Sequence, residues 1–288
     1  MTEQNTDPKA TTSTPGDPAK GPRVALVTGL TRRIGIAPAI VSRLLGDGFS
    51  VLASGWAAHD AEMPWGEDPD GGQTLVAAMA AELDDPSRLQ WVEADLADAE
   101  TPAHLVDATR ERFGAIDAVV ATHARSSHTN LDEVTAAELD RCWAINSRAS
   151  LLLAQALGKA FDPTRGHGRV VLFCSGQHLG PMGSEIAYAV SKGAIQQMTE
   201  SVADELGGRN ITANCINPGP VDTGYATGEV HAAVARQFPT GRWGSPGDIA
   251  NLVSFLLSPE GGWLTGQTLN TEGGFRRFHQ FDPETRLD

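Results

Sequence analysis

The stretch 24-VALVTGLTRRIGIAPAIVSRLL-45 decides the fold of this chain. The apolar run Val24–Thr28 leads into a turn that holds two glycines, Gly29 and Gly35, and a helical pattern follows. A strand, a glycine-bearing turn and a helix are the usual start of a nucleotide-binding unit. Because Arg32 and Arg33 occupy the middle of this turn, its ability to hold a phosphate depends on how the turn is aligned.

Short apolar runs alternate with helical patterns along most of the chain. The strand-like runs are Val24–Thr28, Ser50–Ser54, Leu89–Glu93, Ala118–Thr122, Arg169–Cys174, Thr212–Ile216 and Gln267–Asn270, and the helical patterns cover about 37–46, 73–84, 101–113, 135–160, 184–206 and 246–257. Most of these runs are almost continuously apolar, as in strands buried on both faces of a parallel sheet. The pattern predicts an α/β fold: a Rossmann-type, doubly wound parallel sheet of about seven strands with helices on both faces.

The predicted single domain spans residues 23–276, between tails at 1–22 and 277–288. The first tail is rich in Thr, Pro, Asp and Lys and lacks an apolar signal segment, so we expect it to be disordered. Two long segments, 57–72 and 222–244, follow the second and sixth strands. Ligands bind outside the carboxyl ends of such strands, so 222–244 is expected to be a substrate lid. Segment 57–72 is either a surface insertion or part of the site.

Composition excludes several functional classes. The formal net charge is −14, which disfavours nucleic acid and anionic membranes as partners. No apolar run is long enough for a membrane-spanning helix. The three cysteines, Cys142, Cys174 and Cys215, have no CxxC spacing, so we expect buried free thiols in a reducing, cytoplasmic setting and no structural zinc. No HExxH or carboxylate–histidine cluster indicates a metal site.

The candidate catalytic group is Ser175, Tyr188 and Lys192. The tyrosine and the lysine are four residues apart in a helical pattern, so they share one face, and the serine ends the fifth predicted strand. A free phenol is a poor base because its pKa is about 10, and a neighbouring ammonium would lower it. Such a trio can move a proton at an oxygen while hydride moves at the adjoining carbon.

These features together resemble the short-chain dehydrogenase/reductase family over about residues 22–275. The matches, in chain order, are Thr28-Gly29, Asp95-Leu96, Asn146 in 143-WAINSRAS-150, Ser175 with Tyr188 and Lys192, Asn217-Pro218-Gly219-Pro220-Val221 with Thr223, and 265-TGQTLNTEGG-274. The resemblance implies that Tyr188 is the acid/base and that Lys192 binds the nicotinamide ribose. It further implies that Ser175 orients the substrate oxygen and that Asn146 supports a proton relay.

The resemblance also implies a set of cofactor contacts. They are Thr28, Gly29, Thr31, Arg32, Arg33, Gly35, Ile36, Trp56, Asp95, Leu96, Thr122, Tyr188, Lys192, Pro218, Gly219, Val221 and Thr223. One segment departs from the family, which usually has Asn-Asn-Ala-Gly where this chain has 121-ATHA-124 followed by Arg125. Arg125 is expected to reach towards substrate or phosphate. His123 and His178 are weaker candidates, each more often a polar loop residue than a catalytic group.

The helix that follows the turn aligns its glycines. Apolar residues at 36, 37, 40, 41, 44 and 45 form one core-facing stripe. Matching this stripe to the family's helix start makes Gly35 the second glycine and Ala37 the third, with Arg33 and Ile34 as a two-residue insertion. Alanine is acceptable at the third position, which serves helix–strand packing, and Pro38 suits a first helical turn. The phosphate cradle is therefore predicted to be intact and lengthened.

The expected cofactor is NADP(H), with NAD(H) as the alternative. No carboxylate stands at Gly55 or Trp56, where an acidic residue would bind the ribose of NAD. Arg32 and Arg33 are the candidates for holding the 2′-phosphate of NADP. Asp60 or Glu62 would reverse this preference if segment 57–72 folded back towards the ribose.

The leading hypothesis is an oxidoreductase that transfers hydride between NADP(H) and a carbonyl or secondary alcohol. The substrate is a small molecule, of 3-ketoacyl, polyketide or sugar-like type. The alternatives are an NAD-dependent alcohol dehydrogenase and a non-catalytic NADP(H)-binding regulator. An enoyl reductase is less expected, because those enzymes place tyrosine and lysine about seven residues apart. The family commonly assembles through its long helices, so a homotetramer or dimer is expected through 135–160 and 184–206.

Overall fold

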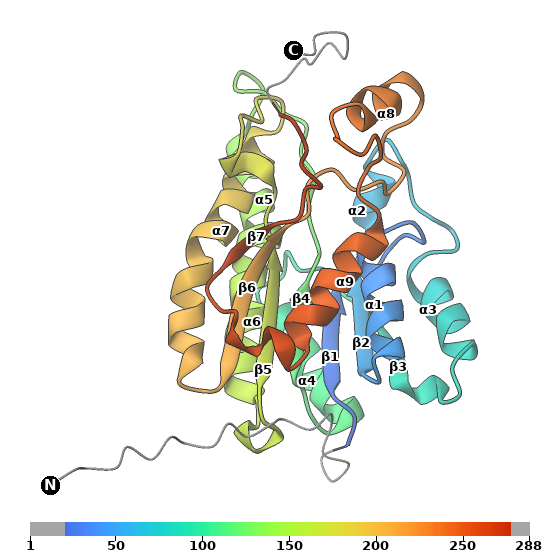
Figure 1. Cartoon of the computed structure of the whole chain (residues 1–288), viewed down its shortest axis with the longest axis vertical. Coiled ribbons are helices and arrows are strands. Elements are labelled where there is room, and N and C mark those ends of the chain that lie inside the picture. Colours follow the sequence, from blue (N-terminus) through green and yellow to red (C-terminus); the bar gives the residue numbers. More distant parts are fainter. Residues whose placement is uncertain (1–20, 278–288) are drawn as a thin grey trace, which may run out of the picture.

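A computed structural model describes residues 21–277 of the 288-residue chain. The predicted tails, 1–22 and 277–288, lie almost entirely outside the described residues. Within them the chain forms one sheet covered by helices on both faces, as Figure 1 shows.

The sheet contains seven parallel strands in the order β3-β2-β1-β4-β5-β6-β7. The strands are β1 (Val24–Thr28), β2 (Ser50–Gly55), β3 (Leu89–Glu93), β4 (Ala118–Ala121), β5 (Gly168–Phe173), β6 (Ile211–Asn217) and β7 (Thr268–Asn270). Every predicted strand is present with its ends within one residue. Two residues that were predicted to end strands, Thr122 and Cys174, lie one residue beyond the observed ends of β4 and β5.

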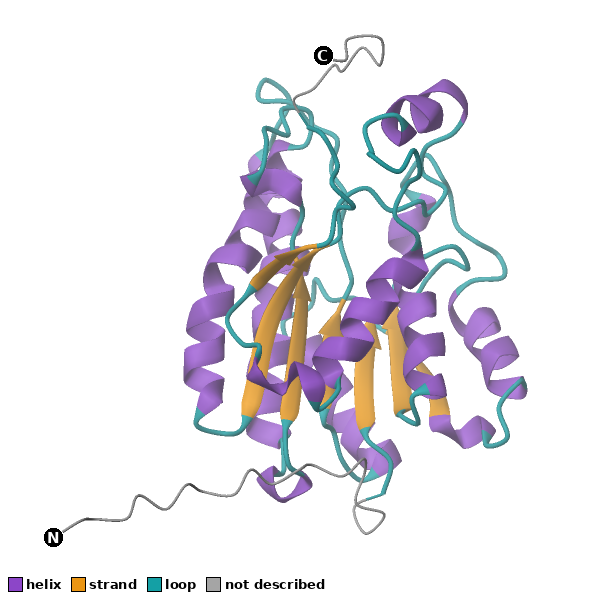
Figure 2. Cartoon of the chain, viewed as in Figure 1, coloured by secondary structure: helices purple, strands orange, loops and turns teal. Residues whose placement is uncertain are grey.

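The helices form two layers around this sheet (Figures 1 and 2). They are α1 (Ile36–Gly46), α2 (Ala57–Ala61), α3 (Gly72–Ala81), α4 (Thr101–Phe113), α5 (Ala136–Cys142), α6 (Ala149–Ala160), α7 (Ile186–Gly207), α8 (Gly228–Ala235) and α9 (Pro246–Leu257). Helices α1 and α9 share one apolar core with the sheet, and α4, α6 and α7 share the other. Ser245 precedes α9 and forms a capping box with Asp248, which satisfies two otherwise unpaired N–H groups.

The predicted helix 135–160 is wrong as a single α-helix. It divides into α5, a π-helix at Trp143–Arg148 and α6. A π-turn accommodates about one residue more than an α-turn, and apolar periodicity does not reveal such an insertion. The insertion turns Asn146 and Ser147 into the protein, where both are buried.

The two long segments lie at the carboxyl end of the sheet and contain the short helices α2 and α8. Figure 2 shows the strand arrowheads pointing towards the end of the molecule that carries these helices. Segment 57–72 folds back onto the glycine-bearing turn, where Gly72 N donates to Thr31 O at 3.1 Å. Both segments are therefore placed where loops can contact a ligand.

Within residues 21–277, no helix has the length and apolar character that crossing a bilayer requires. All three cysteines are buried and free, as the sequence predicts.

Candidate functional site

The predicted catalytic trio comes together at the carboxyl end of β5. Helix α7 carries Tyr188 and Lys192 one turn apart, and Ser175 follows β5 at the start of a short 3-10 helix. The Ser175 hydroxyl lies near enough to the phenol of Tyr188 to lower its pKa. The ammonium of Lys192 is buried and donates to Phe173 O at 2.8 Å, and its Nζ lies 5.8 Å from the centroid of the Tyr188 ring.

Burial controls the proton affinities of this trio. It raises the pKa of Tyr188, and the negative charge of Glu185 raises it further, while the nearby Ser175 hydroxyl opposes the rise. Burial also lowers the pKa of Lys192 to about 8. Desolvation is the largest influence on the phenol, so the net shift of the Tyr188 pKa in this structure is upward. The phenol is held in its protonated form at neutral pH.

Asn146 is fully buried. Its Nδ2 donates to Ser191 Oγ at 2.8 Å and to Arg125 O at 3.1 Å, and its Oδ1 accepts from Arg125 N at 2.7 Å. The Ser191 hydroxyl in turn donates to Tyr188 O at 2.8 Å. A continuous set of hydrogen bonds thus joins the π-helix, the end of β4 and the helix that carries the tyrosine.

The glycine-bearing turn has the predicted alignment. Gly35 is the residue that precedes α1, which begins at Ile36, and no side chain caps the N–H groups of the first helical turn. Gly29 has a φ of +85°, and a Cβ there would stand 2.7 Å from His123 N. The turn therefore needs glycine at Gly29 because two chain segments meet closely there. A helix start with free N–H groups fits the pyrophosphate of a dinucleotide.

A pocket of about 90 Å³ opens beside this turn. It is lined by Gly29, Thr31, Gly55, Trp56, His59, Asp60, Ala94, Asp95, Leu96, His123, Ala124, Arg125 and Ile145. Five predicted cofactor contacts are among them: Gly29, Thr31, Trp56, Asp95 and Leu96. The pocket, called the dinucleotide pocket below, runs from the ends of β2 and β3 to the segment beside Asn146.

The two arginines of the turn lie beside a separate hollow formed with residues 65–69. Arg33 pairs with Asp68 at 3.4 Å and with Asp70 at 3.1 Å, and Arg32 lies over the ring of Trp65 at 5.6 Å. The carboxylates of segment 57–72 therefore offset the charge of Arg33. In the same segment, Asp60 is buried in the dinucleotide pocket, where it accepts from Trp65 Nε1 at 2.9 Å.

The predicted nicotinamide-side contacts follow β6. Gly219 has a φ of +61°, and its N–H donates to Asn217 Oδ1 at 3.1 Å. Val221 is buried and bridges to Gly244, which closes the base of segment 222–244. Pro218 and Thr223 lie on the same loop, at the carboxyl edge of the sheet.

The unusual segment 121-ATHA-124 ties β4 to β1. Thr122 Oγ1 donates to Thr28 O, and His123 Nδ1 lies 2.7 Å from Thr28 Oγ1. On its other side, His123 Nε2 lies 3.0 Å from Ile145 O. Since a carbonyl only accepts, Nε2 carries the proton and Nδ1 accepts from the threonine hydroxyl. His123 is therefore a buried neutral bridge, whereas His178 is exposed.

The sequence interpretation missed Glu185 and Tyr225, which act on the pKa of the phenol, and the rings of Trp243 and His231, which pack beside Tyr225. Glu185 precedes α7, and Tyr225, His231 and Trp243 come from segment 222–244. The Trp243 ring stacks on His231 at 4.9 Å and meets Tyr225 edge-on at 5.5 Å. One signal was available: the chain has only two tyrosines, and both lie at this site.

Comparison with known proteins agrees with this geometry. Residues 29–276 match the family model described as enoyl-(acyl carrier protein) reductase. The oxidoreductase YjdA of Bacillus subtilis is 33% identical over 256 residues, covering 88% of this chain and 97% of YjdA. Elsinochrome reductase 1 of Elsinoe fawcettii is 31% identical over 273 residues, covering 87% of this chain and 93% of that protein.

A solved structure is similar as well. It is a blue fluorescent protein from a metagenomic library in complex with NADPH, with a TM-score of 0.76 and 30% identity, covering 88% of this chain and 98% of that one. The chain belongs to the short-chain dehydrogenase/reductase family. It is an oxidoreductase that acts on CH–OH or C=O groups with a nicotinamide dinucleotide.

The buried bridge at His123 predicts a pH-dependent stability. Desolvation, aided by the charge of Lys192, lowers its pKa from 6.5 to about 3. Below pH 6.5 the His123 ring therefore binds a proton in the unfolded state but not in the folded state. The free energy of unfolding falls as the pH is lowered. Urea unfolding should show His123→Gln losing about 2 kcal/mol less than the wild type between pH 7.5 and pH 5.

The matched control is His128→Gln, whose ring is 57% exposed. An equal loss of stability in wild type and His123→Gln would contradict the bridge.

Proposed function

We propose that this protein transfers hydride between NADP(H) and a carbonyl or secondary alcohol, with Tyr188 as the acid/base. The observation that carries the proposal is the convergence of Ser175, Tyr188 and Lys192 at the carboxyl edge of the sheet that also bounds the dinucleotide pocket. When bound, the nicotinamide supplies the hydride for reduction or takes it in oxidation.

The side chains would then move the proton. In reduction, Ser175 orients the carbonyl oxygen and Tyr188 gives its proton to that oxygen as hydride reaches the carbon. The phenol is protonated at neutral pH, as proton donation to the substrate oxygen requires. Lys192 Nζ is buried beside the phenol and would bind the nicotinamide ribose, and Asn146 would support proton supply through its hydrogen bonds.

Two alternatives differ in chemistry. The matched family model is described as an enoyl reductase, but the spacing of four residues between Tyr188 and Lys192 favours C=O over C=C reduction. A non-catalytic regulator would explain the altered segment 121-ATHA-124. The structure shows that segment making the β1–β4 connection through other side chains, so its departure does not argue against catalysis.

NADP(H) is the proposed cofactor. Gly55 and Trp56 present no carboxylate, and Arg32, which has no ion pair within residues 21–277, remains the candidate for the 2′-phosphate. The NADPH complex of a relative supports this choice. NAD(H) is favoured by one observation: Asp60 is buried in the pocket, where its carboxylate could accept from a ribose hydroxyl and would repel a phosphate.

The site favours a ring ketone that carries hydroxyl groups, of the polyketide type. Glu185 and Tyr225 both lie close enough to Tyr188 to act on its pKa, and they offer an acceptor and an aromatic face. Segment 222–244 would close over this substrate, with α8 held by the Trp243–His231 contact. Elsinochrome reductase 1, a relative, is named for reduction of one particular compound, which is consistent with a ketone substrate.

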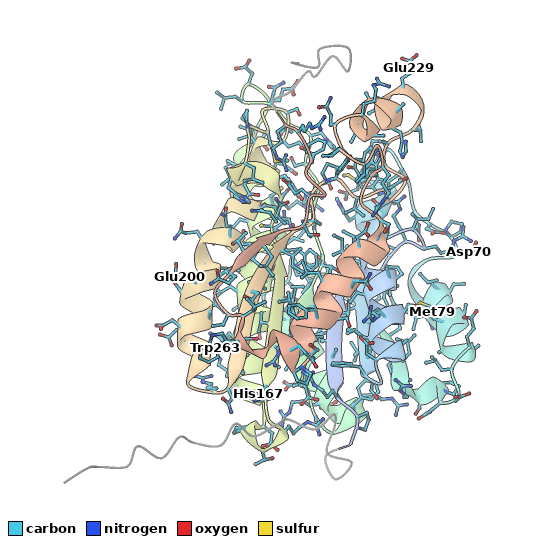
Figure 3. All side chains as sticks on the ribbon, viewed as in Figure 1. Asp70, Met79, His167, Glu200, Glu229 and Trp263 are labelled. Carbon is cyan, nitrogen blue, oxygen red and sulfur yellow. The ribbon has the colours of Figure 1, made fainter. Side chains whose placement is uncertain are left out.

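We also propose assembly into a dimer or tetramer in the cytoplasm. Leu139, Trp143, Leu151 and Val190 leave an exposed apolar face on the long helices α5 to α7. Burying such a face against a second copy would remove apolar area from water. A further tryptophan, Trp263, labelled in Figure 3, is 98% exposed and ends the 3-10 helix Glu260–Trp263 that precedes β7.

Substitution of the phenol tests the mechanism. Tyr188→Phe keeps the ring and its packing but has no proton to give, so turnover of ketones should fall by a factor of about a thousand or more. Cofactor affinity, measured by fluorescence titration, should stay within about threefold of wild type. Turnover that survives in Tyr188→Phe would exclude Tyr188 as the acid/base.

Cofactor choice is tested by dissociation constants for NADPH and NADH. Wild type should prefer NADPH, and Arg32→Ala should weaken NADPH about tenfold with little effect on NADH, because a charge-assisted bond to the 2′-phosphate is lost. Arg33→Ala is the matched control, since its charge is already engaged by two aspartates. A wild-type preference for NADH that Asp60→Asn abolishes would instead establish the ribose contact.

The negative charge of Glu185 should appear in the pH profile. It raises the pKa of Tyr188, so Glu185→Gln should move the rising limb of the alcohol oxidation rate to lower pH, by up to about one unit. Glu200→Gln is the control because Glu200 is exposed on the same helix, as Figure 3 shows. Identical profiles for wild type and Glu185→Gln would rule out an ionised carboxylate at the phenol.

A further inference from the structure

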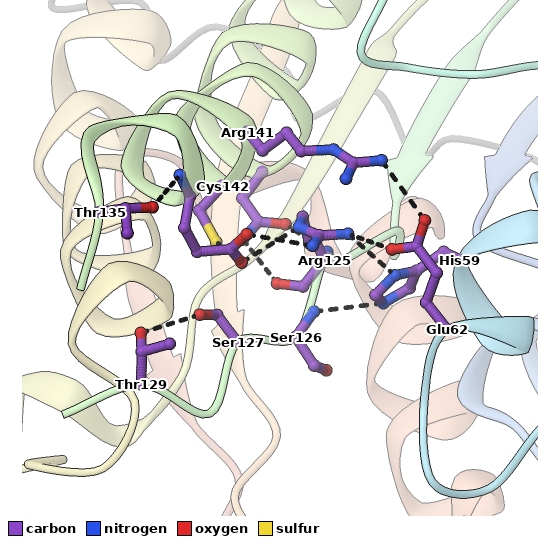
Figure 4. Close-up of polar contacts among 11 residues, drawn as sticks. His59, Glu62, Arg125, Ser126, Ser127, Thr129, Thr135, Arg141 and Cys142 are labelled. Atoms are coloured by element: carbon purple, nitrogen blue, oxygen red, sulfur yellow. Dashed lines mark hydrogen bonds and ion pairs between the residues drawn. The ribbon is translucent and has the colours of Figure 1, made fainter. Parts of the chain in front are cut away.

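Arg125 stands at the junction of the dinucleotide pocket and the Asn146 hydrogen bonds. It follows β4, and its side chain is only 9% exposed. Arg125 was expected to reach towards substrate or phosphate, but its guanidinium is already engaged by carboxylates. Three of its nitrogens instead contact carboxylates of two different elements, as Figure 4 shows.

Two nitrogens of this guanidinium bind Glu138 on α5. Arg125 Nε lies 3.1 Å from Glu138 Oε1, and Arg125 Nη2 lies 3.1 Å from Glu138 Oε2. This two-point contact fixes the plane of both groups. The carboxylate of Glu138 is 19% exposed and also accepts from Cys142, so it is anchored within the protein. Helix α5 continues directly into the π-helix that holds Asn146.

The third nitrogen binds Glu62 in segment 57–72. Arg125 Nη1 lies 3.1 Å from Glu62 Oε2, and Ser126 N donates to His59 Nε2 at 3.3 Å. The far part of the same segment is fastened to the glycine-bearing turn through Asp68 and Gly72. The segment thus crosses the adenosine side of the pocket and is tied down on both sides.

The backbone of Arg125 binds the asparagine directly. Its N–H and its carbonyl both pair with the Asn146 side chain, and Arg125 also lines the dinucleotide pocket. Any shift of this residue would therefore move the Asn146 amide and the pocket wall together. Since the guanidinium is bound at two separate places, each carboxylate restrains a different side of the site.

We propose that Arg125 is a positioning residue that couples the cofactor pocket to the proton-relay asparagine, with Glu62 and Glu138 as its two separable restraints. The inference rests on the proposed function for the role of Asn146. The Glu62 contact holds segment 57–72 closed over the adenosine end and governs how tightly the dinucleotide binds. The Glu138 contact holds the backbone at Arg125, and through it Asn146, and governs the rate of turnover.

The two restraints are separated by isosteric substitutions. Glu62→Gln removes a half-exposed charge, so NADPH should bind about fivefold more weakly, and kcat should fall by less than that factor. Glu138→Gln removes the buried two-point contact, so kcat should fall tenfold or more, and NADPH affinity should change by less than about threefold. Raising ionic strength should weaken NADPH binding more in wild type than in Glu62→Gln, because the Glu62 contact is the one that salt screens.

The matched control is Asp107→Asn, which removes an exposed carboxylate that pairs with Arg110 at 3.6 Å on α4 and contacts neither Arg125 nor segment 57–72. It should leave both parameters near wild type. Arg125→Lys keeps the charge but cannot bridge both carboxylates, and it serves if Glu138→Gln does not fold. The proposal is overturned if Arg125→Lys matches wild type in both parameters, or if Glu62→Gln and Glu138→Gln change affinity and kcat in the same proportion. NADPH binding needs no substrate, so the Glu62 result stands apart from a failure of the catalytic assignment at Tyr188.

Discussion

The close approach of β1 and β4 at their carboxyl ends is the constraint on which the site depends. The strand order turns back at β1, so chain segments leave in opposite directions on its two sides and a crevice opens between them. Gly29 permits the approach because a Cβ would collide with the backbone of His123. Thr28 and His123 then hold the two strand ends together by a buried hydrogen bond. The dinucleotide pocket and the segment beside Asn146 both form on this junction.

Two buried cations, Lys192 and Arg125, also shape the site, and they differ in the groups that bind them. The ammonium of Lys192 has a single backbone acceptor, so burial lowers its pKa to about 8 and the group is ready to exchange partners. The guanidinium of Arg125 has two carboxylates and stays charged in a fixed plane. One buried cation suits a changing contact with cofactor and substrate, and the other suits a permanent scaffold.

The sequence was sufficient for most of the scaffold because the signals were local. Apolar runs located every strand, and the helical stripe after the turn placed Gly35 before α1. The site was less accessible because it depends on where long segments fold back. The pairing of Arg33 with Asp68, and the placement of Asp60 in the pocket, arise from contacts about 30 residues apart in the chain, which no local pattern encodes. The spacing of Tyr188 and Lys192 was correct, but the rise in the phenol pKa follows from burial, which only the fold determines.

The π-helix changes the direction in which the side chains that follow it leave the long helix. Asn146 follows Glu138 by eight residues, and in an unbroken α-helix such positions differ by roughly a quarter turn. The wider turn at Trp143–Arg148 absorbs about one residue, so the two positions return to almost the same face. Arg125 can for this reason reach Glu138 with its side chain while its backbone meets Asn146. A single extra residue in the helix thus sets the angle between the Glu138 carboxylate and the Asn146 amide.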